Sequence, residues 1–302
     1  MRPSPRSLRW VGLLLALGVL PAALTLRAAK APDPLPTLAS APPVKQLGQW
    51  VWTTRDAERF ATARAQDHGL VPALLVGSVR RESGQLRMRR GIDPATTGAR
   101  RVAAVVRLED SVHAALTKDS TRQFAEQVEN LLNPLLLEVS KSGVELAELQ
   151  LDYDVPVSKL GLWAEALREL RKGPLRLVSL WITSVPSHVA DAHYGEHLRG
   201  VVDGTILQLF DTGLPCTGVN QRKLGHQLSS HGLAFRIGVG AFERARTGSG
   251  SGVPKAVSDH GCWLQRSVSF REDPLYRGTW VFAANQDTLG AFRALTAPGS
   301  TS

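Results

Sequence analysis

Acidic residues are absent from the first 30 positions of this 302-residue sequence, although five positive charges lie there. The whole chain carries a formal net charge of +9, so the part that follows these positions is near +4. That excess is too small to indicate nucleic-acid binding, and no nucleic-acid-binding motif accompanies it. We therefore expect no nucleic-acid partner, and we read the basic start as a segment separate from the body of the protein.

Cysteine is also scarce, since the sequence holds only Cys216 and Cys262. Neither lies near the N-terminal apolar segment, which excludes a lipid attached there through a thiol. An even count in an exported chain is compatible with one disulfide, and both cysteines lie in Gly/Pro-rich loop contexts. We predict a bridge with the two Cα atoms about 6 Å apart. The alternative is two unpaired, half-buried thiols.

The N-terminal segment has the pattern of an export signal. Three arginines within Met1–Arg9 precede the apolar run Trp10–Leu26, and Ala29-Lys30-Ala31 could be the cleavage site. The run has about 17 residues, the lower limit for a membrane span, so an uncleaved anchor is the alternative. In either case we expect a periplasmic or secreted protein that contacts a membrane only through this segment.

The predicted domain organisation is a signal or anchor over 1–31, a Pro/Ala-rich linker over 32–45 and a single domain over 46–298. With 43% hydrophobic residues the domain can bury a sizeable core. Eight strands, separated mostly by helices, predict a (β/α)₈ TIM-type barrel, with an open doubly wound sheet as the alternative. The predicted strands are 47–53, 71–79, 102–109, the acidic strand before Pro156, 175–184, 201–210, 233–239 and 279–284.

Helical patterns lie between most of these strands, but two segments show neither a helical nor a strand pattern. The predicted helices are 56–68, 111–142 with a break near Pro134, 158–172, 187–198, 219–230 and 287–295. The arginine-rich stretch 80–101 reads as a solvated loop or, alternatively, as a patch for anionic envelope polymers. Residues from about 247 to 277 read as irregular.

The acidic strand alternates strictly between polar and apolar residues. Glu148, Gln150, Asp152 and Asp154 share one face, and we expect this face to line the barrel lumen. Asp152 and Asp154 end the strand, where such barrels keep their chemistry. Each should raise the proton affinity of the other, so that the outer acid, Asp154, donates a proton while the inner acid orients it.

The carboxyl ends of the other predicted strands supply further candidate ligand-binding residues, because parallel strands end at one rim. Acids, amides and aromatic rings suit a sugar, whose hydroxyls need polar partners and whose C–H faces need flat rings. We predict a catalytic pair, Asp152 and Asp154, in a cleft that contains the substrate-binding residues Trp52, Arg107, Gln150, Thr183, Gln208, Asp211 and Trp280. The alternative for the tryptophans is ordinary core filling.

The segment His193-Tyr194-Gly195-Glu196-His197 matches the H-x-x-E-H pattern of some zinc peptidases. Gly195 weakens the predicted helix, the helix falls on the outside of the barrel, and no third ligand is evident. We favour a surface histidine pair and expect neither a metal nor another cofactor.

The run Leu149–Pro156, together with Ile182–Ser187 and Ile206–Leu209, resembles an uncharacterised bacterial family, domain of unknown function 3142. The resemblance extends over about residues 45–285 and implies no activity.

The same segments look more distantly like chitinase-type glycoside hydrolases of family eighteen, whose fourth strand carries D-x-x-D-x-D-x-E. Matching the final acid to Asp154 places Asp152 on the preceding Asp, with Gln150 and Ala147 at the earlier Asp positions. The resemblance implies that the proton donor is Asp rather than Glu. Phe210-Asp211 stands where that family has Tyr-Asp on the sixth strand.

We therefore predict a monomeric, exported, glycoside-hydrolase-like barrel that hydrolyses or binds an envelope or extracellular glycan. The alternative from another class is a non-catalytic barrel that binds glycans or serves as a scaffold. A zinc peptidase is the least favoured reading.

Overall fold

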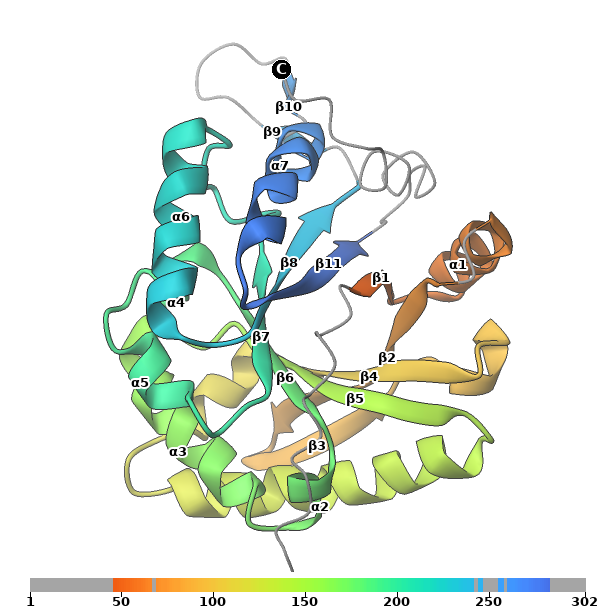
Figure 1. Cartoon of the computed structure of the whole chain (residues 1–302). Helices are drawn as coiled ribbons and strands as arrows, with labels where there is room; N and C mark the ends of the chain where they lie inside the picture. Colours follow the sequence, from red (N-terminus) through yellow and green to blue (C-terminus); the bar gives the residue numbers. More distant parts are fainter. Residues whose placement is uncertain (1–45, 67–68, 242–243, 247–254, 258–259, 283–302) are drawn as a thin grey trace, which may run out of the picture. The chain divides into compact units, whose positions relative to one another are not determined.

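The computed structural model describes residues 46–66, 69–241, 244–246, 255–257 and 260–282 (Figure 1). Within them, eight parallel strands close into a barrel because the first strand pairs with both the second and the last. The strands are β1 (Gln46–Val51), β2 (Val71–Glu82), β4 (Arg101–Leu108), β5 (Glu145–Asp152), β6 (Leu180–Ser184), β7 (Gly204–Gln208), β8 (Phe235–Gly240) and β11 (Tyr276–Phe282). The predicted TIM-type barrel is confirmed, and the open sheet is wrong.

Helices follow most of the strands and surround the barrel (Figure 1). They are α1 (Thr54–Gln66), α2 (Thr121–Lys141), α3 (Leu160–Leu170), α4 (Pro186–Val189), α5 (Tyr194–Leu198), α6 (Gly218–His231) and α7 (His260–Ser267). Short 3₁₀ turns are η1 (Pro94–Thr97), η2 (Asp110–Ala114), η3 (Val157–Lys159), η4 (Pro174–Leu177) and η5 (Val268–Glu272). No helix within these ranges is long and apolar enough to cross a bilayer.

Three expectations about the helices are corrected. Helix α2 continues through Pro134 without a break, because its buried face, which includes Leu132 and Leu135, holds it against the barrel despite one missing backbone donor. The helix expected over 187–198 is two short helices, α4 and α5. The segment expected to be irregular contains α7, where Trp263 packs into the core.

The arginine-rich stretch forms a hairpin rather than a loop. Strand β2 runs on to Glu82, and a turn at Ser83 and Gly84 leads to β3 (Gln85–Arg90), which pairs antiparallel with the end of β2. Both turn residues have positive φ, 49° and 85°, as tight hairpin turns require. The short strands β9 (Arg244–Arg246) and β10 (Lys255–Val257) pair with each other.

The barrel has two layers of packing, one outside the strands and one in the lumen. The lumen is filled by Trp50, Trp181 and Trp280. Two of these indoles lie where a neighbouring strand has glycine: a Cβ atom at Gly48 would lie 2.3 Å from the Trp280 ring, and one at Gly204 would lie 2.3 Å from the Trp181 ring. The lumen is therefore a packed core over most of its depth, as in other barrels of this type.

The predicted leader (1–31), the linker (32–45) and the closing helix (287–295) lie outside the described residues.

Candidate functional site

Strand β5 places its polar face in the lumen, as its alternation predicts. Glu148, Gln150 and Asp152 are buried, with 5%, 0% and 3% of their surface exposed. Leu149 and Leu151, on the opposite face, pack in the outer core. The strand ends at Asp152, and Asp154 follows in an exposed position. One acid is thus held inside the barrel, and the next polar position projects at its mouth.

The lower part of the polar face is neutralised by Arg236 of β8. Its guanidinium contacts both carboxylate oxygens of Glu148, with Nη2 2.9 Å from Oε2, and its Cζ lies 3.7 Å above the Trp181 ring. Gln150 donates to Glu148 Oε1 at 2.8 Å and accepts from Trp50 Nε1 at 3.0 Å. These residues form a closed network in the lumen, so the prediction that Gln150 contacts a ligand is corrected.

Asp152 lies above this network and is held by donors from two other strands. Its Oδ1 accepts hydrogen bonds from Thr183 Oγ1 at 2.8 Å and from Gln208 Nε2 at 3.1 Å. Arg107 Nη1 lies 3.9 Å from Oδ2. Burial raises the pKa of Asp152, the charge of Asp154 adds to this effect, and Arg107 and the two hydrogen bonds oppose it. The raised pKa belongs to the inner acid, whereas the sequence-based hypothesis gave the proton to the outer one.

A cavity of about 250 Å³ opens above Asp152 at the carboxyl ends of the strands. We call it the rim pocket. It is lined by six predicted residues, Trp52, Arg107, Asp152, Asp154, Gln208 and Asp211, together with Val185, Phe210, Thr212 and Phe282.

Aromatic rings form one wall of the rim pocket. The Phe282 ring lies 4.9 Å from that of Trp52 and is stacked on Phe210 at 5.4 Å. The Arg107 guanidinium lies 5.1 Å from the centre of the Trp52 ring. Flat apolar surface thus faces carboxylate, amide and guanidinium groups across a small space, an arrangement that suits a sugar.

Two further predicted contacts do not line the rim pocket. Thr183 is buried, and its hydroxyl accepts a hydrogen bond from the Tyr153 backbone N–H while donating to Asp152. It therefore positions the acid rather than touching a ligand. Trp280 is fully buried in the lumen, so its assignment as a sugar-stacking residue is corrected in favour of core filling.

The backbone that carries Asp154 is fixed by two histidines that the sequence reading did not single out. His113 Nε2 lies 3.2 Å from the Asp154 carbonyl oxygen, and His188 Nε2 lies 2.6 Å from that of Val155. Burial lowers the pKa of His188. A neutral His188 ring can donate its Nε2–H to the Val155 carbonyl oxygen, and this hydrogen bond fixes the backbone that follows β5.

The H-x-x-E-H segment lies away from the rim pocket, in α5 and at His193 directly before it. His193 and Glu196 are exposed and contact each other, with Nδ1 3.1 Å from Oε2. Gly195 packs against His231, where a Cβ atom would lie 2.5 Å from the backbone oxygen. Among the described residues no group of three or more histidines, cysteines or acids could hold a metal ion. The glycine in the motif therefore has a packing role.

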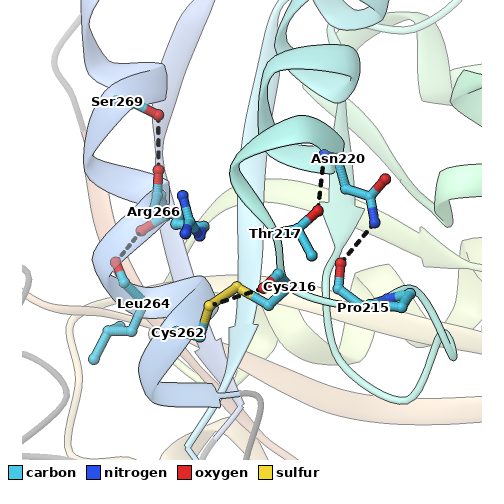
Figure 2. Close-up of a disulfide and its surroundings, with 9 residues drawn as sticks. Pro215, Cys216, Thr217, Asn220, Cys262, Leu264, Arg266 and Ser269 are labelled. Atoms are coloured by element: carbon cyan, nitrogen blue, oxygen red, sulfur yellow. Dashed lines mark hydrogen bonds between the residues drawn. A yellow bond between two sulfur atoms is a disulfide. The ribbon is translucent and has the colours of Figure 1, made fainter.

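Cys216 and Cys262 form a disulfide with an S–S distance of 2.04 Å and a Cα separation of 6.2 Å (Figure 2). Cys216 lies just before α6, where Thr217 caps the helix by accepting from the Asn220 N–H at 3.2 Å, and Cys262 lies in α7. The bridge therefore ties the loop after β7 to α7. That loop carries Phe210 and the following residues of the rim pocket.

Solved structures with the same fold include enzymes and an inhibitor. The spore cortex-lytic enzyme SleL from Bacillus megaterium QM B1551 has a TM-score of 0.58 at 11% identity, over 85% of this chain and 74% of its own. The chitinase ICChI from Ipomoea carnea has a TM-score of 0.50 at 12% identity, over 82% and 98%. The xylanase-alpha-amylase inhibitor protein XAIP-I, solved with trehalose, has a TM-score of 0.51 at 11% identity, over 83% and 97%.

At such low sequence identities these similarities show only that the fold is shared. For the fold, they confirm the distant resemblance to chitinase-type barrels. No match to a curated protein was found. A family model does match the central part of the chain, although over a shorter range than the sequence resemblance implied. Residues 98–237 match the family described as Domain of unknown function (DUF3142), which confirms over this segment the resemblance carried by Leu149–Pro156.

Proposed function

We propose that this protein is an exported glycoside-hydrolase-like barrel that binds a glycan in the rim pocket and cleaves it there. The observation that carries the proposal is the juxtaposition of an exposed acid, Asp154, and a buried acid of raised pKa, Asp152, in a pocket with an aromatic wall. The barrels of a cortex-lytic enzyme and a chitinase have the same fold, which supports the same class of ligand.

The rim pocket has the size and surface for part of a glycan chain. Its volume of about 250 Å³ is below the roughly 300 to 1,000 Å³ of drug-sized ligand sites. We infer that one sugar unit enters it and that the rest of the chain lies along the rim. The rings of Trp52 and Phe210 offer flat contact surface, while Arg107 and Gln208 offer donors for hydroxyl groups.

The two acids divide the chemistry between them. Cleavage of a glycosidic bond needs a proton for the departing oxygen and negative charge beside the developing oxocarbenium ion. Because burial raises its pKa, Asp152 retains a proton at pH values where an ordinary aspartate has lost it. Asp154, exposed at the mouth, is the acid that contacts the ligand. The proton held by Asp152 passes through the Asp154 carboxylate to the departing oxygen as the bond between that oxygen and the anomeric carbon breaks. Water then adds to the anomeric carbon and returns its own proton to the two acids.

The alternative is a barrel that binds a glycan without cleaving it. One observation favours it: Asp152 Oδ1 already accepts two hydrogen bonds from the protein, so this acid could serve mainly to fix Thr183 and Gln208. The likeness to an inhibitor protein shows that this fold also serves proteins with roles other than catalysis. Turnover, rather than binding, separates the two functions.

Export to the periplasm or beyond is part of the proposal. The disulfide supports it, since such bridges persist in oxidising compartments. N-terminal sequencing of protein from cell fractions would show whether cleavage follows Ala31 or whether the chain remains anchored. Sedimentation of the same material tests the expected monomer.

The experiment that tests the proposed function is a screen of the full chain for binding and hydrolysis on a glycan panel. We expect Asp154→Asn to lower turnover about 100-fold or more, because general acid catalysis typically contributes 10² to 10⁴, and to leave binding intact. The control is Asp119→Asn, which removes an exposed acid outside the rim pocket.

Full activity in Asp154→Asn would show that the catalytic assignment is wrong. Binding without any turnover in the wild-type protein would select the non-catalytic barrel. If no glycan binds, the proposal as a whole is wrong.

A further inference from the structure

The β2–β3 hairpin concentrates positive charge next to the rim pocket. It carries five arginines, Arg80, Arg81, Arg87, Arg89 and Arg90, and one acid, Glu82. Ser78 of β2 is the register partner both of Arg107, which lines the rim pocket, and of Arg89 on β3. The hairpin therefore extends the barrel wall outward from the strand neighbouring Arg107.

The register divides the hairpin arginines between its two faces. Val79 and Leu86 belong to the outer core, so their face of the hairpin is turned towards the helical layer. Residues two apart along a strand share a face. Arg80, Arg87 and Arg89 are therefore on the opposite face, the one that continues from Arg107 at the lumen wall. Together with Glu82, Ser83 and the partly buried Met88 at the edge of β3, they line a surface hollow of about 470 Å³.

This arginine face is electrostatically unbalanced. Arg80 and Arg87 are directly opposite each other in the register, and like charges in such positions are destabilising. Glu82 pairs with Arg80 at 2.5 Å. Within the described part of the chain Arg87 and Arg89 form no ion pair, although Arg87 donates to the neutral side chain of Gln85 at 2.9 Å. Two exposed guanidinium groups thus remain available to an anion.

We propose that the arginine face is a subsite for the carboxylate groups of an anionic glycan whose neighbouring sugar occupies the rim pocket. This inference rests on the proposed function and narrows its substrate class. The guanidinium group binds carboxylates with a planar, bidentate fork of donors, which suits a row of acidic sugars better than neutral ones. Because the arginine face continues from Arg107, the arginine face and the rim pocket lie on the same face of the paired strands β2 and β4.

The test compares two probes with the same sugar backbone, the negatively charged oligogalacturonate and its uncharged methyl ester. We expect the wild-type chain to bind the carboxylate form about five- to tenfold more tightly at low salt, with the preference shrinking as salt screens the charges. Arg87→Gln/Arg89→Gln should abolish the preference and leave binding of the ester unchanged. The matched control, Arg81→Gln/Arg90→Gln, removes the same amount of charge from the other face of the hairpin. This variant should keep the preference for the carboxylate form.

Equal affinity for the two probes, or a preference that survives Arg87→Gln/Arg89→Gln, overturns the inference. If a neutral glycan binds in the rim pocket but oligogalacturonate does not, the anionic subsite is wrong while the proposed function stands. If no glycan binds, both fall. A single-stranded DNA oligonucleotide that binds to the arginine face as tightly as oligogalacturonate would assign the face to polyanions in general and contradict the glycan subsite.

Discussion

Replacing Arg236 with methionine should strongly destabilise the barrel, because it leaves the Glu148 carboxylate buried without its cation. Both side chains of this pair are only 7% exposed, and Gln150 is the only other donor to Glu148 among the described residues. Breaking a buried ion pair by removing one partner costs about 3 to 5 kcal/mol. For a domain of this size the loss corresponds to a fall in melting temperature of roughly 6 to 20 °C.

The structure supplies a matched control for this measurement. Arg101 and Glu145 form the same type of pair between β4 and β5, but their side chains are 55% and 67% exposed. Arg101→Met should therefore cost less than about 1 kcal/mol. The double variant Arg236→Met/Glu148→Gln should recover much of the lost stability, since it removes the unpaired charge. If urea denaturation gives equal losses for Arg236→Met and Arg101→Met, the reasoning about the lumen network is refuted.

Two further predictions concern the rim pocket and its supports. The pKa of Asp152 is raised in the folded state above its ordinary value of 3.8. The favourable contribution of this group to the free energy of unfolding is therefore fully present below pH 3.8, and it is lost as pH rises through the folded-state pKa. Asp152→Asn should thus be more stable than wild type at pH 7, with the difference vanishing at low pH; a difference in stability that is the same at all pH values contradicts this. Cys216→Ser/Cys262→Ser, which opens a loop with a sequence separation of 46, should lower the free energy of unfolding by about 4 kcal/mol and weaken glycan binding through Phe210. Unchanged affinity would show that the bridge does not support the rim pocket.

Much of the barrel could be predicted because its information is local. Alternation along β5 fixes which residues face the lumen, and helical patterns between strands imply parallel pairing. Since parallel strands end at one rim, residues as distant as Trp52 and Asp211 could be assigned to one pocket before their contacts were known.

What could not be predicted depends on register between strands. Arg236 and Glu148 are 88 positions apart, and their contact follows only from barrel closure. The local sequence offered one sign of a buried ion pair, namely an arginine within the otherwise apolar strand Phe235–Gly240. Trp280 is buried because Gly48 is its register partner on β1, which a single strand does not reveal. The hairpin was read as a loop because its arginines obscured the alternation of Leu86 and Met88.

The central claim is that a sugar occupies the rim pocket in contact with Asp154, and a crystal structure of Asp154→Asn with a glycan that binds tests it most directly. We predict a sugar ring against Trp52 and Phe210, with the substituted amide side chain at position 154 within hydrogen-bonding distance of a glycosidic oxygen. A glycan bound only elsewhere on the surface, with the rim pocket free of sugar, would contradict the account.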